Sequence, residues 1–203
     1  TTTTITVTMG SAESGSGATT SGGIRVRLYY SIGPAVEESA AGWGLGLWGG
    51  IELGVDYHWI ENGMLTVTQK RAKDYAAESS DRMVLPLGLE HPTVLGSIIK
   101  VARNLPIVPT EVWTVGSSGT LNRGLQLAWP HATLHVVSVG HTMNEREIGR
   151  AIYHRSEYNF DQPVKKNEMP PFPSAPTYDA KAWKFIQELS NKKSATLFWN
   201  VGA

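Results

Sequence analysis

A turn rich in glycine and hydroxyl side chains lies where a strand is expected to end and a helix to begin. Residues 111–115 have the β-branched and aromatic composition of a strand, and residues 119–129 have a helical pattern. The turn consists of Gly116, Ser117, Ser118, Gly119 and Thr120. Its glycines permit close backbone approach, while free N–H groups and the helix dipole favour an anion at the helix start. The sequence therefore predicts a site that binds a phosphate group.

The spacing within this turn narrows the class of ligand. The turn matches neither GxxxxGK[ST] nor GxGxxG, so mononucleotides such as ATP and dinucleotides are disfavoured and a smaller phosphate ester remains. A second interpretation stays open, because a strand-to-helix turn can be rich in glycine and serine merely for tight turning and N-capping.

Other polar groups give weaker signals. Four histidines lie close together in the sequence, but their spacings of four, six and thirteen residues match no metal site, so none is predicted: His131, His135, His141 and His154. Two acidic residues lie near histidines and could form acid/base pairs, although solvated turns are the commoner explanation: His58 with Glu61, and Glu90 with His91.

Strands and helices alternate around the predicted phosphate site. Strands are expected at residues 24–30, 55–60, 111–115, 133–139 and 195–201. Helices are expected at residues 36–41, 65–77, 93–103, 119–129 and 178–189. This alternation predicts an α/β fold with a doubly wound, mostly parallel sheet and helices on both faces, because too few strand–helix units fit for a barrel.

The expected organisation has three parts. Residues 1–23 are almost all Thr, Ser, Gly and Ala, and only Ile5, Val7 and Met9 alternate as a short strand would. We therefore expect a linker-like or irregular segment there, with a ligand loop as the second interpretation. Residues 24–85 form a smaller α/β portion, and residues 86–203 form the phosphate-binding portion.

The bulk composition excludes several classes of protein. The 203 residues include 18 Lys plus Arg and 18 Asp plus Glu, so the net charge is zero and the composition does not argue for a nucleic-acid partner. The absence of cysteine excludes disulfides and thiolate nucleophiles and suits a reducing compartment. No apolar run approaches the roughly 20 residues needed to span a bilayer, and no signal peptide is evident. We expect a cytoplasmic, globular protein with no membrane association.

Ordered segments along the chain resemble one enzyme family. VWTVGSSGTLNRGL, LHVVSVG, PTYDAKAWKFI and ATLFWNVG look like the C-terminal half of the fold-type-II pyridoxal-phosphate enzymes. The most similar branch contains 1-aminocyclopropane-1-carboxylate (ACC) deaminase, D-cysteine desulfhydrase and their bacteriophage relatives. The upstream segments GIRVRLYYSIGP and LGVDYHWIENG fall in the same order, so the match covers about residues 23–203.

The resemblance implies pyridoxal phosphate as the cofactor and assigns residues to it. Gly116 to Thr120 match the family's phosphate loop, and Asp179 falls at the position whose carboxylate bonds the pyridine nitrogen. Such a carboxylate keeps the ring nitrogen protonated, so the ring can accept electrons from the substrate's α-carbon. Tyr178 would lie beside the ring as a stacking or acid/base group. The alternative is that Asp179 merely caps the helix that starts there.

The family's Schiff-base lysine is not identifiable in this sequence, because its segment precedes everything matched. Lys70, Lys73, Lys100 and Lys181 do not match its position, and the nearest counterpart of the family's substrate loop is residues 8–23. A lysine amine holds the cofactor in this chemistry. The resemblance implies that this sequence lacks the usual N-terminal segment, so we expect the lysine to come from a missing segment or a partner chain.

Two functions follow from the resemblance. The first is a pyridoxal-phosphate-dependent deaminase- or lyase-like protein that acts on an amino acid or a similar small molecule, as a homo-oligomer or with a complementing chain. The alternative is a non-catalytic descendant that binds a phosphate ligand or serves as an assembly module, with Trp43 and Trp48 at an oligomer contact. A phosphosugar-binding α/β enzyme of another family is a third, remoter option.

Overall fold

The computed structural model describes residues 2–9, 24–31, 56–59, 65–140, 142–160 and 162–201. The chain divides into two compact units, Thr1–Leu85 and Pro86–Ala203. Several sequence predictions lie outside the described residues: the helix at 36–41, the segment with Trp43 and Trp48, Glu61, His141 and most of the loop at 8–23. Within the described ranges, no helix is both long and apolar enough to cross a bilayer.

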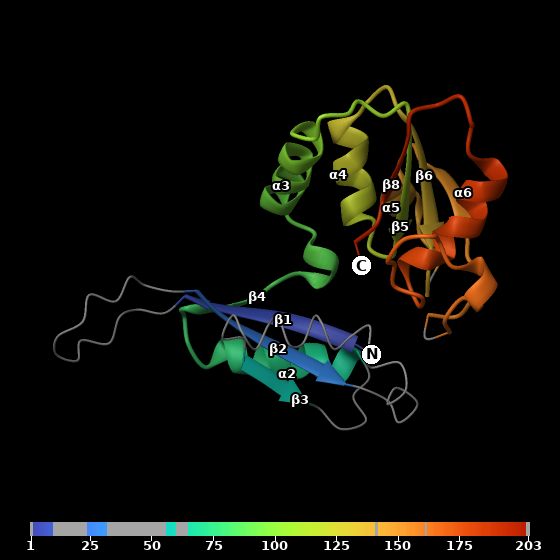
Figure 1. Ribbon diagram of the computed structural model, residues 1–203. Coiled ribbons are helices and arrows are strands. Elements are labelled where there is room, and N and C mark those ends of the chain that lie inside the picture. Colours follow the sequence, from blue (N-terminus) through green and yellow to red (C-terminus); the bar gives the residue numbers. More distant parts are fainter. Residues whose placement is uncertain are drawn as a thin grey trace, which may run out of the picture. The chain divides into compact units, whose positions relative to one another are not determined.

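The first unit contains a mixed four-stranded sheet and one described helix. Its strands are β1 (Thr2–Met9), β2 (Ile24–Ser31), β3 (Asp56–Trp59) and β4 (Arg82–Val84), in the order β3-β2-β1-β4. β1 runs antiparallel to β2 and β4, whereas β2 and β3 are parallel (Figure 1). Helix α2 (Leu65–Ala77) buries Thr68 and Ala72, which are four residues apart on one face.

Strand β1 corrects the expectation of a linker at the start of the chain. All eight of its residues pair with β2, from Thr2 opposite Ser31 to Met9 opposite Ile24. Threonine is β-branched and restricted at χ1, so a threonine run suits a strand better than a flexible linker. Composition alone was therefore a misleading guide to residues 2–9.

The second unit contains an all-parallel sheet. Its strands are β5 (Glu111–Gly116), β6 (Thr133–Ser138), β7 (Ile152–Arg155) and β8 (Thr196–Trp199), in the order β7-β6-β5-β8. Its α-helices are α3 (Pro92–Arg103), α4 (Thr120–Ala128), α5 (Glu145–Ile148) and α6 (Trp183–Leu189). The 3-10 helices among the described residues of this unit are η2 (Leu87–Leu89), η3 (Lys166–Glu168) and η4 (Asp179–Ala182). Strand β7 and helix α5 were not predicted from the sequence.

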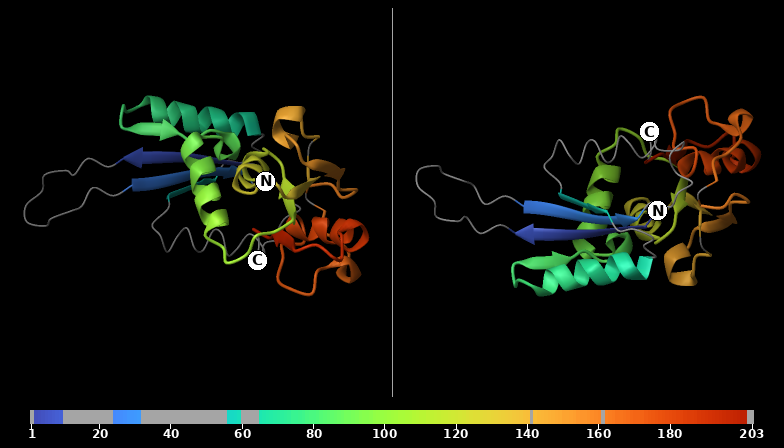
Figure 2. Two further views of the ribbon diagram at one scale, coloured as in Figure 1. Left: turned by 90° about the horizontal axis from the view of Figure 1, so that it is seen from above. Right: turned by 90° about the horizontal axis from the view of Figure 1, so that it is seen from below.

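Helices cover both faces of this sheet, as Figures 1 and 2 show for α3 and α4 on one side and α6 on the other. Successive strand residues point to opposite faces. Val112, Leu134 and Val136 pack with Leu125 of α4 in one core cluster. Trp113, Val115 and Val137 pack with Ile186 of α6 in the other. The predicted doubly wound arrangement is therefore present in this unit.

A row of polar and aromatic side chains crosses the α6 face of the sheet. Trp113 stacks on its cross-strand partner His135 at 3.9 Å between ring centroids, and His135 Nδ1 lies 3.0 Å from His154 Nε2. Glu111 accepts a 2.6 Å hydrogen bond from Trp113 Nε1 and lies 3.8 Å from His135 Nε2. Burial is the main cause that lowers the pKa of both histidines. The negative charge of Glu111 partly opposes this lowering of the pKa for His135, whereas the charge of His135 lowers the pKa of His154 further. The folded protein therefore favours the neutral form of both rings.

Stability is expected to fall as the pH drops below about 6.5, the ordinary pKa of histidine. The folded pKa values of His135 and His154 are lowered, so the unfolded chain binds protons first and is favoured on acidification. Above that pH the two histidines contribute no pH dependence. The free energy of unfolding, measured in urea at pH 7.5 and at pH 5.5, should fall less between these two pH values for His154→Gln than for the wild type. His131→Gln is the control because His131 is exposed, and equal losses in all three proteins would contradict the expectation.

Candidate functional site

The predicted phosphate loop lies at the carboxyl end of β5 and leads into α4. Gly119 is the N-cap of α4 with a φ of 75°, and a Cβ there would lie 2.6 Å from the Cα and the carbonyl oxygen of Glu147 in α5. At Gly116, a Cβ would lie 2.8 Å from Val136 Cγ2. Both positions therefore require glycine: Gly119 for its backbone angle and for space, and Gly116 for space alone.

The hydroxyl groups of this loop do not act as a side-chain N-cap. The N-cap residue is Gly119, which has no side chain to donate or accept. Ser118 Oγ instead lies 3.4 Å from the carbonyl oxygen of Gly88 and 3.3 Å from Thr120 Oγ1. The first N–H groups of any helix lack partners within that helix. The loop thus keeps the features that favour an anion.

Asn122 fixes the helix behind the loop. This fully buried side chain donates from Nδ2 to the carbonyl oxygens of Glu147 at 2.8 Å and Ile148 at 2.9 Å. Asn144 caps α5, accepting from the Glu147 amide at 3.0 Å while its own amide donates to the Glu147 carboxylate at 2.8 Å. These bonds hold α5 against the start of α4 and define one wall of the loop.

Tyr178 and Asp179 lie on the α6 side of β5, the strand that ends at the loop. Tyr178 packs on the cluster that contains Val115 and Val139, and its ring meets Phe160 edge-on at 6.3 Å. Asp179 is 1% exposed and begins η4, which packs against β5. The loop and this pair are therefore both associated with β5, and Val115, a member of that cluster, directly precedes the loop.

The environment of Tyr178 restricts its chemistry. Burial, assisted by the negative charge of Asp179, raises the pKa of Tyr178 to about 12. The phenol therefore keeps its proton at neutral pH and can donate a hydrogen bond. The expected helix at 178–189 is in fact η4 followed by α6, and Tyr178 rather than Asp179 occupies the N-cap position of η4.

The lysines considered from the sequence have other surroundings. Lys70 is exposed and pairs with Asp74 at 2.7 Å, while Lys73 and Lys100 are exposed on helices. Lys181 is 2% exposed, and its Nζ donates to the carbonyl oxygens of Asn159 at 2.7 Å and Phe160 at 3.1 Å. Its bonds tie the segment after β7 to η4, so its amine already has a structural role.

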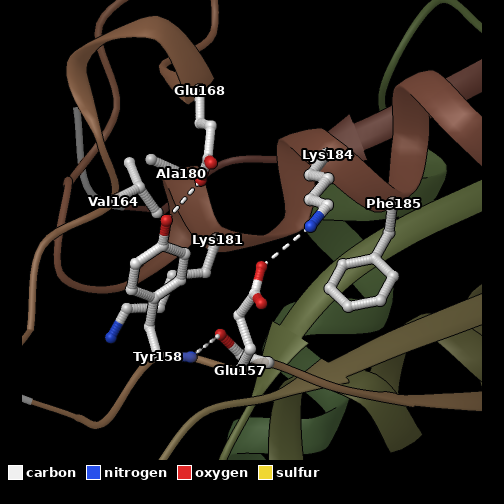
Figure 3. A pocket seen from close by; sticks show the side chains of 9 residues that line it. Glu157, Tyr158, Val164, Glu168, Ala180, Lys181, Lys184 and Phe185 are labelled. Atoms are coloured by element: carbon white, nitrogen blue, oxygen red, sulfur yellow. Dashed lines mark hydrogen bonds and ion pairs between the residues drawn. The ribbon is translucent and has the colours of Figure 1, made fainter.

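Figure 3 shows the small cavity beside Lys181. Its volume is about 10 Å³, which is room for roughly one water molecule. Two contacts bridge its walls: Tyr158 donates to Glu168 at 2.5 Å, and Lys184 pairs with Glu157 at 2.8 Å (Figure 3). This cavity is too small for an aromatic cofactor, so the loop and the Tyr178–Asp179 pair remain the candidate site.

A cluster beside the loop was missed in the sequence. Glu90 Oε1 lies 3.3 Å from Arg123 Nη1 and 2.5 Å from Arg146 Nη2. His91 instead caps α3, because its Nδ1 accepts from the amide of Thr93 at 3.2 Å. The suggested Glu90–His91 acid/base pair is thus wrong: the carboxylate binds arginines and the imidazole binds backbone.

Comparison with known proteins gives a structural match. No family model matches the chain, and no curated protein matches it. A solved structure described as an ACC deaminase homologue matches with a TM-score of 0.62 over 86% of this chain, at 14% sequence identity. The chain has an ACC deaminase-like fold. It covers 64% of the length of that homologue.

This ACC deaminase-like fold confirms the predicted fold class, because the mixed α/β architecture with a parallel sheet flanked by helices is the one expected from the sequence. At 14% identity the likeness concerns the fold alone. The roles of the loop, Tyr178 and Asp179 remain predictions.

Proposed function

We propose that this chain is a pyridoxal-phosphate-dependent deaminase- or lyase-like protein of the ACC deaminase branch, acting on an amino acid or a similar small molecule. One observation carries the proposal: in an ACC deaminase-like fold, a phosphate-type loop and a buried tyrosine–aspartate pair are associated with the same central strand. A phosphate group and a pyridine nitrogen are two ends of one cofactor.

The residues present fit that cofactor. Gly116 to Thr120 would hold its phosphate, because the start of α4 favours an anion and the hydroxyl groups of the loop can donate to it. Asp179 would accept a hydrogen bond from the protonated ring nitrogen, and burial strengthens such a charge-assisted bond. When bound, pyridoxal phosphate supplies an electron-accepting ring. The protonated Tyr178 would position the ring and donate a hydrogen bond to it or to the substrate.

The lysine that this chemistry needs is proposed to come from elsewhere in the protein or from a partner chain. Lys181 is disfavoured, because its amine donates to two backbone carbonyls and a change in those bonds would free the segment after β7. A homo-oligomer or a complementing chain would supply the group in the second case.

Titration of the full chain with pyridoxal phosphate tests the proposal. We expect saturable binding that is tighter than binding of inorganic phosphate, with a visible absorbance band. Borohydride reduction followed by mass spectrometry should label one lysine, either in this protein or in the complementing chain supplied with it. Thr120→Val should weaken binding of both ligands, because Thr120 is buried in the loop, whereas Thr133→Val, at an exposed position, is the matched control. Equal affinity for the two ligands would refute a cofactor site.

A non-catalytic descendant is the second candidate, favoured by the structural role of Lys181. In that case pyridoxal phosphate binds saturably, but borohydride labels no lysine at stoichiometric yield. The same titration therefore separates an enzyme from a phosphate-ligand-binding module.

A further inference from the structure

Three charged side chains meet around the start of α4, the helix that follows the loop. Glu90 precedes α3, Arg123 is in the first turn of α4, and Arg146 is in α5. One carboxylate oxygen of Glu90 contacts both guanidinium groups, at 3.3 Å and 2.5 Å. One acidic and two basic groups leave a net positive charge within this cluster.

Arg123 has more donors than its surroundings use. Its Nε and Nη2 are buried, and neither has a hydrogen-bond partner within the described ranges. A guanidinium carries five N–H donors in a planar fork, and a buried donor without an acceptor is costly. Only Nη1 meets Glu90. Arg123 is therefore suited to an oxyanion with several acceptor oxygens. Its single contact with the Glu90 carboxylate does not satisfy all of its donors.

The segment that carries Glu90 also covers part of the loop. The carbonyl oxygen of Gly88 lies 3.4 Å from Ser118 Oγ, and a Cβ added at Gly88 would overlap the Ser118 side chain. The backbone here is strained, because Leu89 has a φ of 56° and is the one non-glycine with positive φ among the described residues. The contacts of Glu90 and Gly88 hold this strained turn against the loop.

We propose that Arg123 and Arg146 complete an oxyanion site beside Ser118, in which the Glu90 carboxylate is a tethered competitor that an incoming phosphate group displaces. The proposal rests on the proposed function only in taking phosphate as the group that the loop binds. Displacement would also release Ser118 from Gly88 and make its hydroxyl available to the ligand.

The competition follows from charge and number of acceptors. A phosphate monoester carries close to two negative charges and three acceptor oxygens at neutral pH, whereas Glu90 carries one charge. Fork-shaped arginine groups bind phosphate with several parallel bonds. Glu90 has the advantage of its attachment, which gives it a high effective concentration. Glu147 follows Arg146 in the sequence, but its carboxylate accepts a hydrogen bond from the Asn144 amide in the cap of α5.

Calorimetric titration of the full chain with inorganic phosphate, at constant ionic strength, tests the site. Glu90→Gln should bind phosphate about threefold to tenfold more tightly, because the competitor loses two ion pairs. Arg123→Gln and Arg146→Gln should each bind it more weakly, about tenfold for Arg123. Glu145→Gln, an exposed carboxylate on α5, is the matched control for charge and should change affinity less than twofold. Arg146 is 77% exposed, so its variant is expected to fold even if Arg123→Gln does not.

Opposite changes for the glutamate and arginine variants would support the site. Unchanged affinity in Glu90→Gln, a change in the same direction in Arg146→Gln, or no phosphate binding by any variant would overturn it. If phosphate behaves as expected but pyridoxal phosphate binds no more tightly than phosphate, the proposed function fails while this site stands.

Discussion

Asp179→Asn is expected to reduce the preference for pyridoxal phosphate over inorganic phosphate by about tenfold to hundredfold. A hydrogen bond to a charged group contributes about 1.5–3 kcal/mol, and about 1.4 kcal/mol corresponds to a factor of ten in affinity. Asparagine keeps the size of this buried side chain but removes the charge that favours a protonated ring nitrogen. Calorimetry of both ligands with the wild type and the variant, at one pH near neutrality, measures the ratio.

Inorganic phosphate serves as the internal reference in that experiment. It has no ring, so its affinity should stay nearly constant in Asp179→Asn. Asp74→Asn, at an exposed position in α2, is the control and should leave the ratio unchanged. An equal fall in affinity for both ligands would mean that Asp179 supports the fold rather than the ring.

Gly119→Ala is expected to lower the free energy of unfolding by about 2–4 kcal/mol. The left-handed backbone angle costs an ordinary residue about 1–2 kcal/mol, and the overlap with the α5 backbone adds a similar amount. Urea unfolding followed by far-UV circular dichroism measures the loss.

Gly96→Ala provides the matched glycine control, because a Cβ there meets nothing within 4 Å. Gly96 lies inside α3, where alanine is favoured over glycine by about 0.5–1 kcal/mol. The two substitutions should therefore shift stability in opposite directions. A loss below 1 kcal/mol at Gly119 would show that α5 moves away without cost.

The parts of the fold predicted from sequence are those with a strong local signal. Strand β5 and helix α4 combine apolar periodicity with a turn of fixed composition, and both lie within a residue or two of their expected bounds. Helix α5 and strand β7 have only four residues each, too few for a period to show. Threonine-rich β1 was missed as a full strand, because its pairing with β2 is a tertiary effect.

The same distinction applies to the candidate site. The loop is contiguous in sequence, so its residue types could be read directly. The Glu90 cluster joins residues 33 and 56 positions apart, and only packing of α3, α4 and α5 brings them together. An exposed glutamate and two arginines have no pattern in sequence that distinguishes them from ordinary surface charges.

The strand order β7-β6-β5-β8 has a consequence for synthesis on the ribosome. One edge of β5 pairs with β6, which follows it closely, but its other edge pairs with β8, and Glu111 meets Thr196 across 85 residues. Such distant contacts form slowly, and an unpaired edge strand invites association with other chains. The nascent protein therefore carries an open β5 edge throughout the translation of α4, α5 and α6, and this interval is when a chaperone would protect it best.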